Sequence, residues 1–399
     1  MPYNQKYRSN NNSRQWGAPR SQPKRPKGKH GQYIDPARFV KAAAALESKD
    51  YTPTNSFDDF AIHPLLKSNI AIKGYKVPSE IQDKTIPLGL SGQDVVGIAN
   101  TGTGKTAAFA VPILNRLMHE PAGRALIIAP TRELAMQIEE QCQIYAKNSG
   151  LKGALLIGGT NINRQIKDLR SNPQMVIGTP GRIKDHIERC TLVLSRFNII
   201  VLDEVDRMLD MGFINDVRLI LGQLAPQRQS FFFSATLGPE VSSLIGSFTS
   251  NPVTVDVKIG DTSGNVNQDV IKYNGPSERI DRLHDVLIAE SMEKALIFCE
   301  MKYGAERLSK ELVARGFKSE SIHGGKSQGQ RKRAMESFRE NRSNILVATD
   351  VAARGIDVTD ISHVINFDIP HTYNDYVHRI GRAGRAGRTG QALTFVQSA

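Results

Sequence analysis

The sequence predicts an α/β fold with two tandem parallel-sheet domains, joined by a short linker and preceded by a basic disordered tail. Short apolar runs that end in Gly, Pro, Thr or Asp alternate with amphipathic helical stretches along most of the chain. This alternation is typical of parallel strands covered on both faces by helices. A polar, glycine-containing stretch interrupts it once, and 399 residues exceed what one ordinary core holds. We therefore place a first domain at 52–255, a linker at 256–268 and a C-terminal domain at 269–399.

The tail, residues 1–34, is strongly basic. Residues 1–30 contain eight Lys or Arg and no acid, which accounts for eight of the twelve net positive charges. A segment with so few apolar residues cannot bury enough surface to fold alone. We interpret it as an arm drawn to nucleic-acid phosphates, with a solubilising leader as the alternative. Residues 35–51 follow as a predicted short helical extension, with Asp35 as N-cap and Pro36 at the first helical position.

Composition excludes several classes of protein. No apolar run approaches the ~18 residues needed to cross a bilayer, and the N-terminus lacks the apolar region of a secretory signal. The three cysteines, Cys142, Cys190 and Cys299, lie far apart and fit neither a disulfide framework nor a zinc site. We expect a cytoplasmic protein that has no membrane partner and is a monomer.

The stretch "ANTGTGKT" lies between the apolar run "DVVGI" and an amphipathic helical stretch. It departs from the P-loop pattern only in Ala99, which replaces the first glycine. Gly102 and Gly104 allow the backbone N–H groups to surround phosphate oxygens, while Lys105 reaches the β and γ phosphates and the Thr106 hydroxyl binds Mg²⁺. The alternative is an ordinary tight turn. The predicted nucleotide contacts here are Ala99, Asn100, Thr101, Gly102, Thr103, Gly104, Lys105 and Thr106.

Two acids follow the apolar run in "IIVLDEVDRML". Asp203 is placed to hold Mg²⁺ and Glu204 to orient or deprotonate the attacking water. The alternative is that the acids cap the next helix, for which Asp206 is suited. Because the carboxyl ends of parallel strands meet at one edge of a sheet, a P-loop and these acids together predict hydrolysis. Gln82 can pair with N6 and N7 of adenine, with Phe57 packed nearby, which favours ATP as the nucleotide.

These stretches resemble the DEAD-box family of ATP-dependent RNA helicases, within helicase superfamily two. The resemblance runs from Phe57 to about Val396. Phe57 with "GYKVPSEIQ" is similar to the Q motif, "ANTGTGKT" to motif I, "PTRELA" to Ia, Gly158-Gly159 to the GG element, "TPGR" to Ib, "DEVD" to II and "SAT" to III. In the second domain "ALIFCEMK" is similar to IV, Gln328 with Arg331 to the Q-x-x-R element, "ATDVAARGID" to V and "HRIGRAGR" to VI.

The chain departs from the family pattern in three places. Val205 replaces the alanine of DEAD and leaves the flanking acids unchanged. Met301 lies near the usual threonine of motif IV, so we predict no contact there. The chain stops at "FVQSA", earlier than family domains usually do, so we expect a closing helix to be missing.

The resemblance implies RecA-like folds for both domains and a composite ATP site. Arg382 and Arg385 match arginine fingers, His378 and Arg379 match positions that connect motif VI to the ATP site and motif III, and Asp357 matches a position near the ribose. Ser234 and Thr236 would couple the ATP and RNA sites, whereas Arg388 lies beyond the motif and is expected to be solvated. The implied RNA contacts are Thr131, Arg132, Gly159, Thr179, Arg182, Arg331, Thr349 and Asp350.

The implied function is an ATP-dependent RNA helicase with ATP and Mg²⁺ as cofactors. ATP hydrolysis stimulated by RNA would be coupled to domain closure, local duplex separation and remodelling of RNA–protein complexes. Backbone contacts carry no sequence code, so we expect little RNA sequence preference, with ribonucleoprotein or ribosome-associated partners. An ATP-gated RNA clamp that does not unwind, and a DNA-directed helicase of the same superfamily, are the alternatives.

Overall fold

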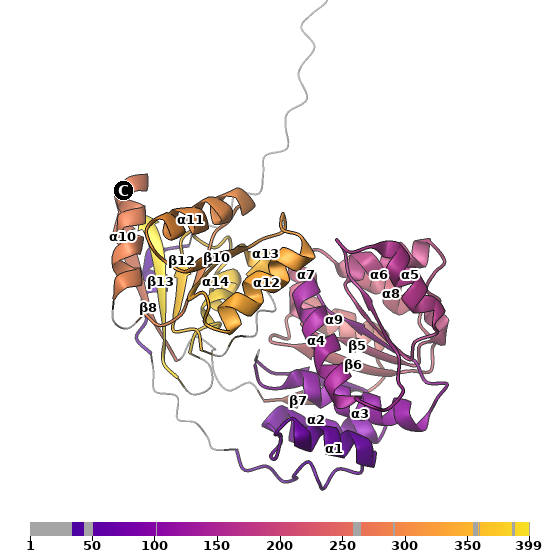
Figure 1. The fold of residues 1–399 in the computed structure, drawn as a ribbon. Coiled ribbons are helices and arrows are strands. Elements are labelled where there is room, and N and C mark those ends of the chain that lie inside the picture. The colour runs from indigo at the N-terminus through magenta and orange to yellow at the C-terminus, as the bar shows by residue number, and fades with distance from the viewer. Residues whose placement is uncertain are drawn as a thin grey trace, which may run out of the picture.

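The computed structural model describes residues 34–43, 51–100, 102–257, 265–289, 292–353, 358, 360–384 and 388–398. These residues form two α/β lobes that lie side by side, each built on one sheet (Figure 1). All strand pairs within the two sheets are parallel. The predicted fold class is therefore confirmed. Among the described helices, none combines the length and the apolar character needed to cross a membrane.

The first lobe has a seven-stranded sheet in the order β3-β4-β2-β5-β6-β1-β7. Its strands are β1 (Val95–Ile98), β2 (Ala125–Ile128), β3 (Gly153–Leu156), β4 (Met175–Gly178), β5 (Ile199–Leu202), β6 (Gln229–Ser234) and β7 (Val253–Asp256). Its helices are α1 (Pro64–Ile72), α2 (Glu80–Leu90), α3 (Lys105–His119), α4 (Arg132–Tyr145), α5 (Ile162–Arg170), α6 (Pro180–Glu188), α7 (Val205–Asp210), α8 (Ile214–Gly222) and α9 (Pro239–Phe248), with a short 3-10 turn η2 (Leu194–Arg196). The apolar runs of the sequence supply the central strands because both faces of the sheet are buried.

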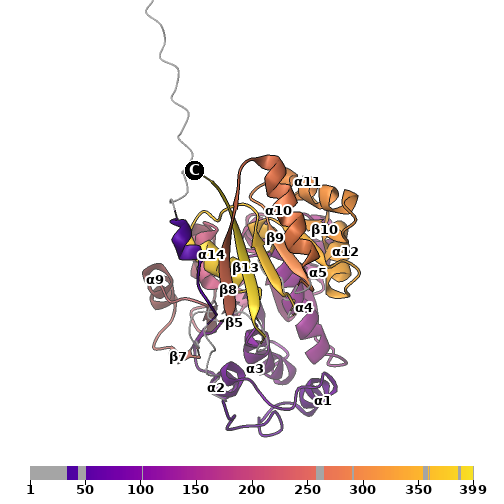
Figure 2. The same ribbon diagram turned by 90° about the vertical axis from the view of Figure 1, so that its left-hand side faces the viewer.

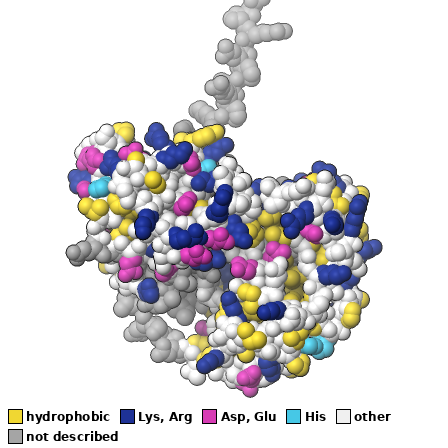
Figure 3. All heavy atoms as spheres, in the orientation of Figure 1, with side chains coloured by type: hydrophobic (Ala, Val, Ile, Leu, Met, Phe, Trp, Pro, Cys, Tyr) yellow, Lys and Arg dark blue, Asp and Glu magenta, His cyan; other side chains and the backbone are white. Residues whose placement is uncertain are grey.

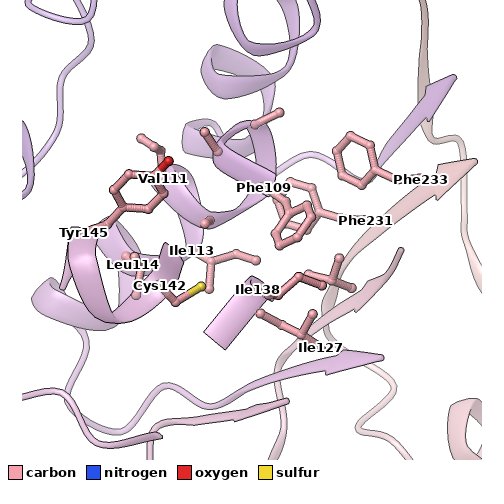
Figure 4. Close-up of a cluster of buried hydrophobic side chains, with 14 of the residues drawn as sticks. Phe109, Val111, Ile113, Leu114, Ile127, Ile138, Cys142, Tyr145, Phe231 and Phe233 are labelled. Carbon is pink, nitrogen blue, oxygen red and sulfur yellow. The ribbon is translucent and has the colours of Figure 1, made fainter. Parts of the chain in front are cut away.

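Aromatic side chains hold α3 against the sheet of the first lobe (Figure 4). The rings of Phe109 on α3 and Phe233 on β6 lie 5.4 Å apart between centroids. Gly97 on β1 is required by this packing, because a Cβ atom there would lie 2.4 Å from Cε1 of Phe233. The close fit fixes the start of α3, and with it Lys105, relative to the end of β1.

The second lobe has a six-stranded sheet in the order β10-β11-β9-β12-β13-β8. Its strands are β8 (Val266–Tyr273), β9 (Ala295–Phe298), β10 (Ser319–Ile322), β11 (Ile345–Ala348), β12 (His363–Asn366) and β13 (Gly390–Gln397). Its helices are α10 (Pro276–Ile288), α11 (Lys302–Ala314), α12 (Gln328–Arg339), α13 (Asp350–Ala353) and α14 (Tyr373–Ile380). Because β7 ends at Asp256 and β8 begins at Val266, the connection is shorter than the predicted linker, and 258–264 lie outside the described residues.

The helix predicted over 35–51 is limited to one 3-10 turn, η1 (Pro36–Phe39), within the described residues. Asp35 does cap it, and its Oδ1 accepts from the backbone N–H of Ala37 at 2.9 Å. Val40 is already extended, and Lys41 pairs with Gln268 of β8 in an antiparallel bridge. The chain leaves the helix because the fully buried Phe39 packs into the second lobe. Ile34, placed in the predicted tail, is instead buried in the core of the second lobe, whereas residues 1–33 and 44–50 lie outside the described residues.

Candidate nucleotide and nucleic-acid site

A cleft of about 570 Å³ lies where the two lobes meet. Basic and acidic side chains both lie near the boundary between the lobes on the face shown in Figure 3. The predicted residues that line the cleft from the first lobe are Gln82, Gly102, Thr103, Gly104, Lys105, Thr106, Asp203 and Glu204. Arg339 and the predicted Arg382 line it from the second lobe. Residues far apart in the sequence therefore share one cavity.

The glycine-rich loop curls between β1 and α3 as its spacing predicts. Gly102 and Gly104 have φ values of +85° and +91°, a backbone conformation that favours glycine. A Cβ atom on Gly104 would also lie 2.3 Å from Nε2 of Gln82. Lys105 is 7 % exposed, and its Nζ donates to the carbonyl of Ala99 at 3.0 Å. The loop carbonyl thus holds the lysine beside the N-terminus of α3. Thr101 lies outside the described residues.

Gln82 is buried and fastened to the glycine-rich loop. Its Oε1 accepts from the backbone N–H of Ser79 at 3.0 Å, and its Nε2 donates to the carbonyl of Gly104, also at 3.0 Å. The Ser79 hydroxyl donates to the carbonyl of Thr103 at 2.7 Å. Two hydrogen bonds therefore fasten the start of α2 to the loop. Adenine contact by the remaining Gln82 N–H stays a prediction.

Two aromatic residues line the cleft, the buried Tyr145 and the more exposed Tyr75, which the sequence reasoning missed although it stands in "GYKVPSEIQ". Phe57 is buried in the core of the first lobe, 6.1 Å from the Tyr75 ring and 5.8 Å from the Phe60 ring between centroids. Phe57 therefore supports Tyr75 from behind. A contact of Phe57 with the base remains untested.

The two acids after β5 are buried at the floor of the cleft. Glu204 adopts a left-handed backbone conformation, φ +55°, and its N–H donates to Oδ1 of Asp203 at 3.0 Å. Oε2 of Glu204 has no hydrogen-bond partner among the described residues. Burial raises the pKa of Asp203 to about 7, Lys105 opposes that rise, and the Glu204 charge adds to it. Two buried carboxylates with one nearby lysine form a site that favours added positive charge.

Asp206 connects motif II to the end of β6. Its Oδ2 accepts from the N–H groups of Ala235 and Thr236 at 3.2 and 2.9 Å, and from the Thr236 hydroxyl at 3.0 Å. The Ser234 hydroxyl donates to the carbonyl of Thr236 at 2.7 Å, and its oxygen accepts from the N–H of Asp206 at 3.4 Å. Ser234 and Thr236 were predicted as coupling residues. The sequence reasoning considered Asp206 only as a helix cap, whereas the structure makes it the centre of this connection.

The second lobe brings α14 and Arg382 to the cleft. Arg382 is 4 % exposed. Arg379 is held inside its own lobe: Nε and Nη2 each donate to the Asp350 carboxylate at 2.6 Å, and Nη1 donates to the carbonyl of Asp368 at 2.6 Å. His378 borders a small gap between the lobes together with Arg207 of α7. Arg379 therefore fixes α14, the helix that precedes Arg382, to the rest of the second lobe. Asp350, which was predicted to contact RNA, instead accepts hydrogen bonds from Arg379 in this structure.

Two predicted residues of this region, Asp357 and Arg385, lie outside the described residues. Arg388 is described and exposed, as its position beyond the motif predicts.

The RNA contacts predicted in the first lobe gather at the carboxyl ends of three neighbouring strands, β3, β4 and β2. Thr131 and Thr179 are the N-cap residues of α4 and α6. Arg132 lies over the glycine pair, since a Cβ atom on Gly159 (φ +75°) would lie 2.2 Å from its Nη1. Helix N-termini and arginines together suit phosphate groups.

A buried glutamine supports the predicted RNA contact Arg182. Oε1 of Gln165 accepts from Nη1 of Arg182 at 3.1 Å, and Nε2 of Gln165 donates to the carbonyl of Ile157 at 2.9 Å. Nε2 of His186 lies 3.0 Å from the same Oε1, and burial lowers the pKa of this histidine. No sequence signal marked Gln165 or His186.

Arg331, predicted to contact RNA from the second lobe, faces the first lobe. Arg331 on α12 forms an ion pair with Glu133 on α4. Burial raises the pKa of Glu133, and Arg331 opposes that rise. Thr349 follows β11 and is 8 % exposed. Arg331 thus joins the two lobes in this structure, and its contact with RNA remains a prediction.

Fold and cleft together define a P-loop nucleotide hydrolase with two RecA-like lobes. Residues 79–244 match the DEAD/DEAH box helicase family, and residues 278–387 match the helicase conserved C-terminal domain. The chain belongs to the DEAD-box family of ATP-dependent RNA helicases, which are ATP-hydrolysing enzymes.

Similar proteins are found in bacteria. The chain is 42% identical to the ATP-dependent RNA helicase CshA of Listeria monocytogenes over 343 residues, 86% of this chain and 66% of the relative. It is 42% identical to the DEAD-box ATP-dependent RNA helicase CshA of Bacillus subtilis over 345 residues, 86% of this chain and 70% of the relative. The chain thus spans about two thirds of the length of these relatives.

Two solved structures share the two-lobed arrangement. S. cerevisiae Dbp5 bound to RNA and ADP BeF3 is 32% identical with a TM-score of 0.75, covering 86% of this chain and 90% of that chain. Mss116p bound to ssRNA and AMP-PNP is 28% identical with a TM-score of 0.78, covering 88% of this chain and 76% of that chain.

Proposed function

We propose that this chain hydrolyses ATP when RNA and ATP bring its two lobes together, and that it uses this cycle to separate RNA duplexes locally. The observation that supports this most strongly is the shared cleft, which Lys105, Asp203 and Glu204 line from the first lobe and Arg382 from the second. A site composed in this way is complete only when the lobes are closed. The rate of ATP hydrolysis therefore depends on closure of the two lobes.

Mg²⁺ fits the floor of this cleft. Thr106 and Asp203 both border the cavity and offer the oxygen ligands that Mg²⁺ prefers. The buried Oε2 of Glu204, which has no hydrogen-bond partner among the described residues, and the raised pKa of Asp203 indicate a place that favours added positive charge. When bound, Mg²⁺ would neutralise charge on the β and γ phosphate oxygens. Glu204 then remains free to orient the attacking water.

RNA is proposed to lie across the predicted contacts of both lobes. The helix N-terminus at Thr131 and the arginines Arg132 and Arg182 suit phosphates in the first lobe. In the second lobe, Arg331 lies at the inter-lobe boundary and Thr349 follows β11. Because ATP and RNA would each bridge the same two lobes, each favours the state that binds the other, and linkage makes this effect reciprocal. The RNA-bound structures of Dbp5 and Mss116p support this placement.

The decisive experiment measures ATP hydrolysis by the full chain with and without single-stranded RNA, and with DNA of matching sequence. We expect RNA to raise kcat at least about ten-fold through the completed arginine site, and DNA to have little effect. Release of a labelled strand from a short RNA duplex under ATP is measured in parallel. Stimulation without strand release would instead support an ATP-gated clamp, and stimulation by DNA would contradict the RNA assignment.

Gln165→Leu tests the RNA side of the proposal. Loss of its Oε1 removes the acceptor that orients Arg182, a hydrogen bond to a charged group worth about 1.5–3 kcal/mol. We expect the RNA concentration for half-maximal ATPase stimulation to rise about ten-fold or more, with an unchanged KM for ATP. The exposed Asn163→Ala on the same helix is the control. An unchanged RNA requirement in Gln165→Leu would contradict a role of Gln165 in positioning an RNA contact, since Asp185 and the carbonyl of Thr160 also contact Arg182.

A further inference from the structure

Residues 34–43 precede the first lobe in sequence but belong to the second lobe in space. Figure 2 shows η1, in indigo, beside α14, with the chain then running along β8. Ile34 and Phe39 are part of a second-lobe core cluster, and Phe39 is fully buried. This segment lies outside both stretches that match the family, 79–244 and 278–387.

The segment covers both tyrosines of α14. The Phe39 ring lies 4.7 Å from the Tyr376 ring between centroids. The Arg38 guanidinium lies over the Tyr373 ring, 3.9 Å from its centroid, which is close enough for a cation–π interaction. Two of the eight residues of α14 therefore pack against chain that is more than 300 positions away.

Backbone hydrogen bonds fix the same segment to β8. Lys41 donates to the carbonyl of Gln268 at 3.0 Å, and Gln268 donates back to Lys41 at 2.8 Å. The N–H of Ala43 donates to Oδ1 of Asn267 at 2.8 Å. The Tyr376 hydroxyl donates to Oε1 of Gln268 at 3.0 Å, which closes the connection from the segment through β8 to α14. Residues 34–43 are thus an integral part of the second lobe.

We propose that Arg38 and Phe39 are positioning residues for ATP hydrolysis: they hold α14 in place, and through it Arg382. This inference rests on the proposed role of Arg382 at the transferring phosphoryl group. α14 ends at Ile380, two residues before Arg382, so any tilt of the helix is carried to the guanidinium. Misplacing a catalytic group by about 1 Å costs up to about 10²-fold in rate. The position of Arg382 therefore depends on residues that precede the first lobe.

The experiment is a double-mutant cycle in the full chain between Phe39→Ala and Arg382→Ala, read as kcat and KM for ATP at saturating RNA. In the parent chain we expect Phe39→Ala to lower kcat about ten-fold or more, with little change in KM for ATP. In the Arg382→Ala chain the same change should have no further effect, because the finger it positions is gone. A merely structural role would lower kcat in both backgrounds, and this result would overturn the inference.

Three further variants keep the test decisive. Val40→Ala, on a side chain that is 57 % exposed in the same segment, should leave kcat unchanged. Phe39→Leu should restore most of the rate, and the exposed Arg38→Ala should lower kcat in the same direction as Phe39→Ala even if the latter folds poorly. Normal kcat in Arg38→Ala and Phe39→Ala would overturn the inference. Normal kcat in Arg382→Ala would instead overturn the proposed site.

Discussion

Glu204→Gln is expected to lower the RNA-stimulated kcat by about 10²–10⁴-fold, the rate factor that a positioned general base typically contributes, while ATP and RNA still bind. This result is expected because the amide keeps the shape of the side chain and loses its negative charge. The buried Oε2 of Glu204 has no hydrogen-bond partner among the described residues, so the substitution breaks no described contact of that atom. Single-turnover hydrolysis measures the chemical step, and fluorescence anisotropy measures binding of nucleotide and RNA.

The exposed Glu188→Gln serves as the matched control, since it makes the same chemical change on the surface of the same lobe. It should retain the parent kcat. A parent-like kcat in Glu204→Gln would show that another group activates the water. Loss of ATP binding in Glu204→Gln would show instead that Glu204 holds the nucleotide and its metal.

Arg382→Ala is expected to lower kcat by about 10³–10⁵-fold, the range that arginine fingers supply to phosphoryl transfer. Its KM for ATP should change much less, because the glycine-rich loop and Lys105, which line the cleft from the first lobe, are predicted to hold the phosphates. Steady-state ATPase measurements at saturating RNA separate the two parameters.

The exposed Arg388→Ala is the control within the same arginine-rich stretch, "HRIGRAGRAGR", and should keep nearly all activity. Equal losses in Arg382→Ala and Arg388→Ala would mean that the stretch acts as a general cationic surface for nucleic acid. That outcome would contradict the composite cleft. From the family resemblance alone, Arg385→Ala should behave like Arg382→Ala.

The architecture was predictable because buried parallel strands need uninterrupted apolar residues. The runs "ALIIAP", "IIVLDE" and "NILVATD" each contain a four-residue strand that is buried throughout. Lys105, Asp203 and Glu204 were predictable for a related reason, since the polar residues that end such runs collect at one edge of the sheet. Local sequence and sheet geometry therefore lead to the same site.

Contacts that depend on tertiary placement were not predictable. Nothing in the sequence distinguishes Tyr75, which faces the cleft, from Phe57, which lies behind it. Gln165 and Asp206 acquire their partners only when neighbouring strands are paired, since no local pattern shows which side chains then meet. The ion pair between Glu133 and Arg331 also depends on how one lobe sits against the other.

The start of the first helical turn was predicted correctly from Asp35 and Pro36, but its length was not. Helix propensity is a weak preference that burial overrides. Here the burial of Phe39 in the second lobe and the bridge between Lys41 and Gln268 stabilise the extended backbone more than further helical turns would stabilise a helix.

The packing of residues 34–43 on the second lobe also determines which fragments of the chain keep that lobe's core intact. A fragment that begins at β8 would contain every strand of the second sheet and still lack the ring that covers Tyr376. During synthesis, Phe39 leaves the ribosome first and must wait for the whole first lobe to be made before its binding surface exists. Truncations that spare both family-matched stretches therefore still remove part of the core of the second lobe.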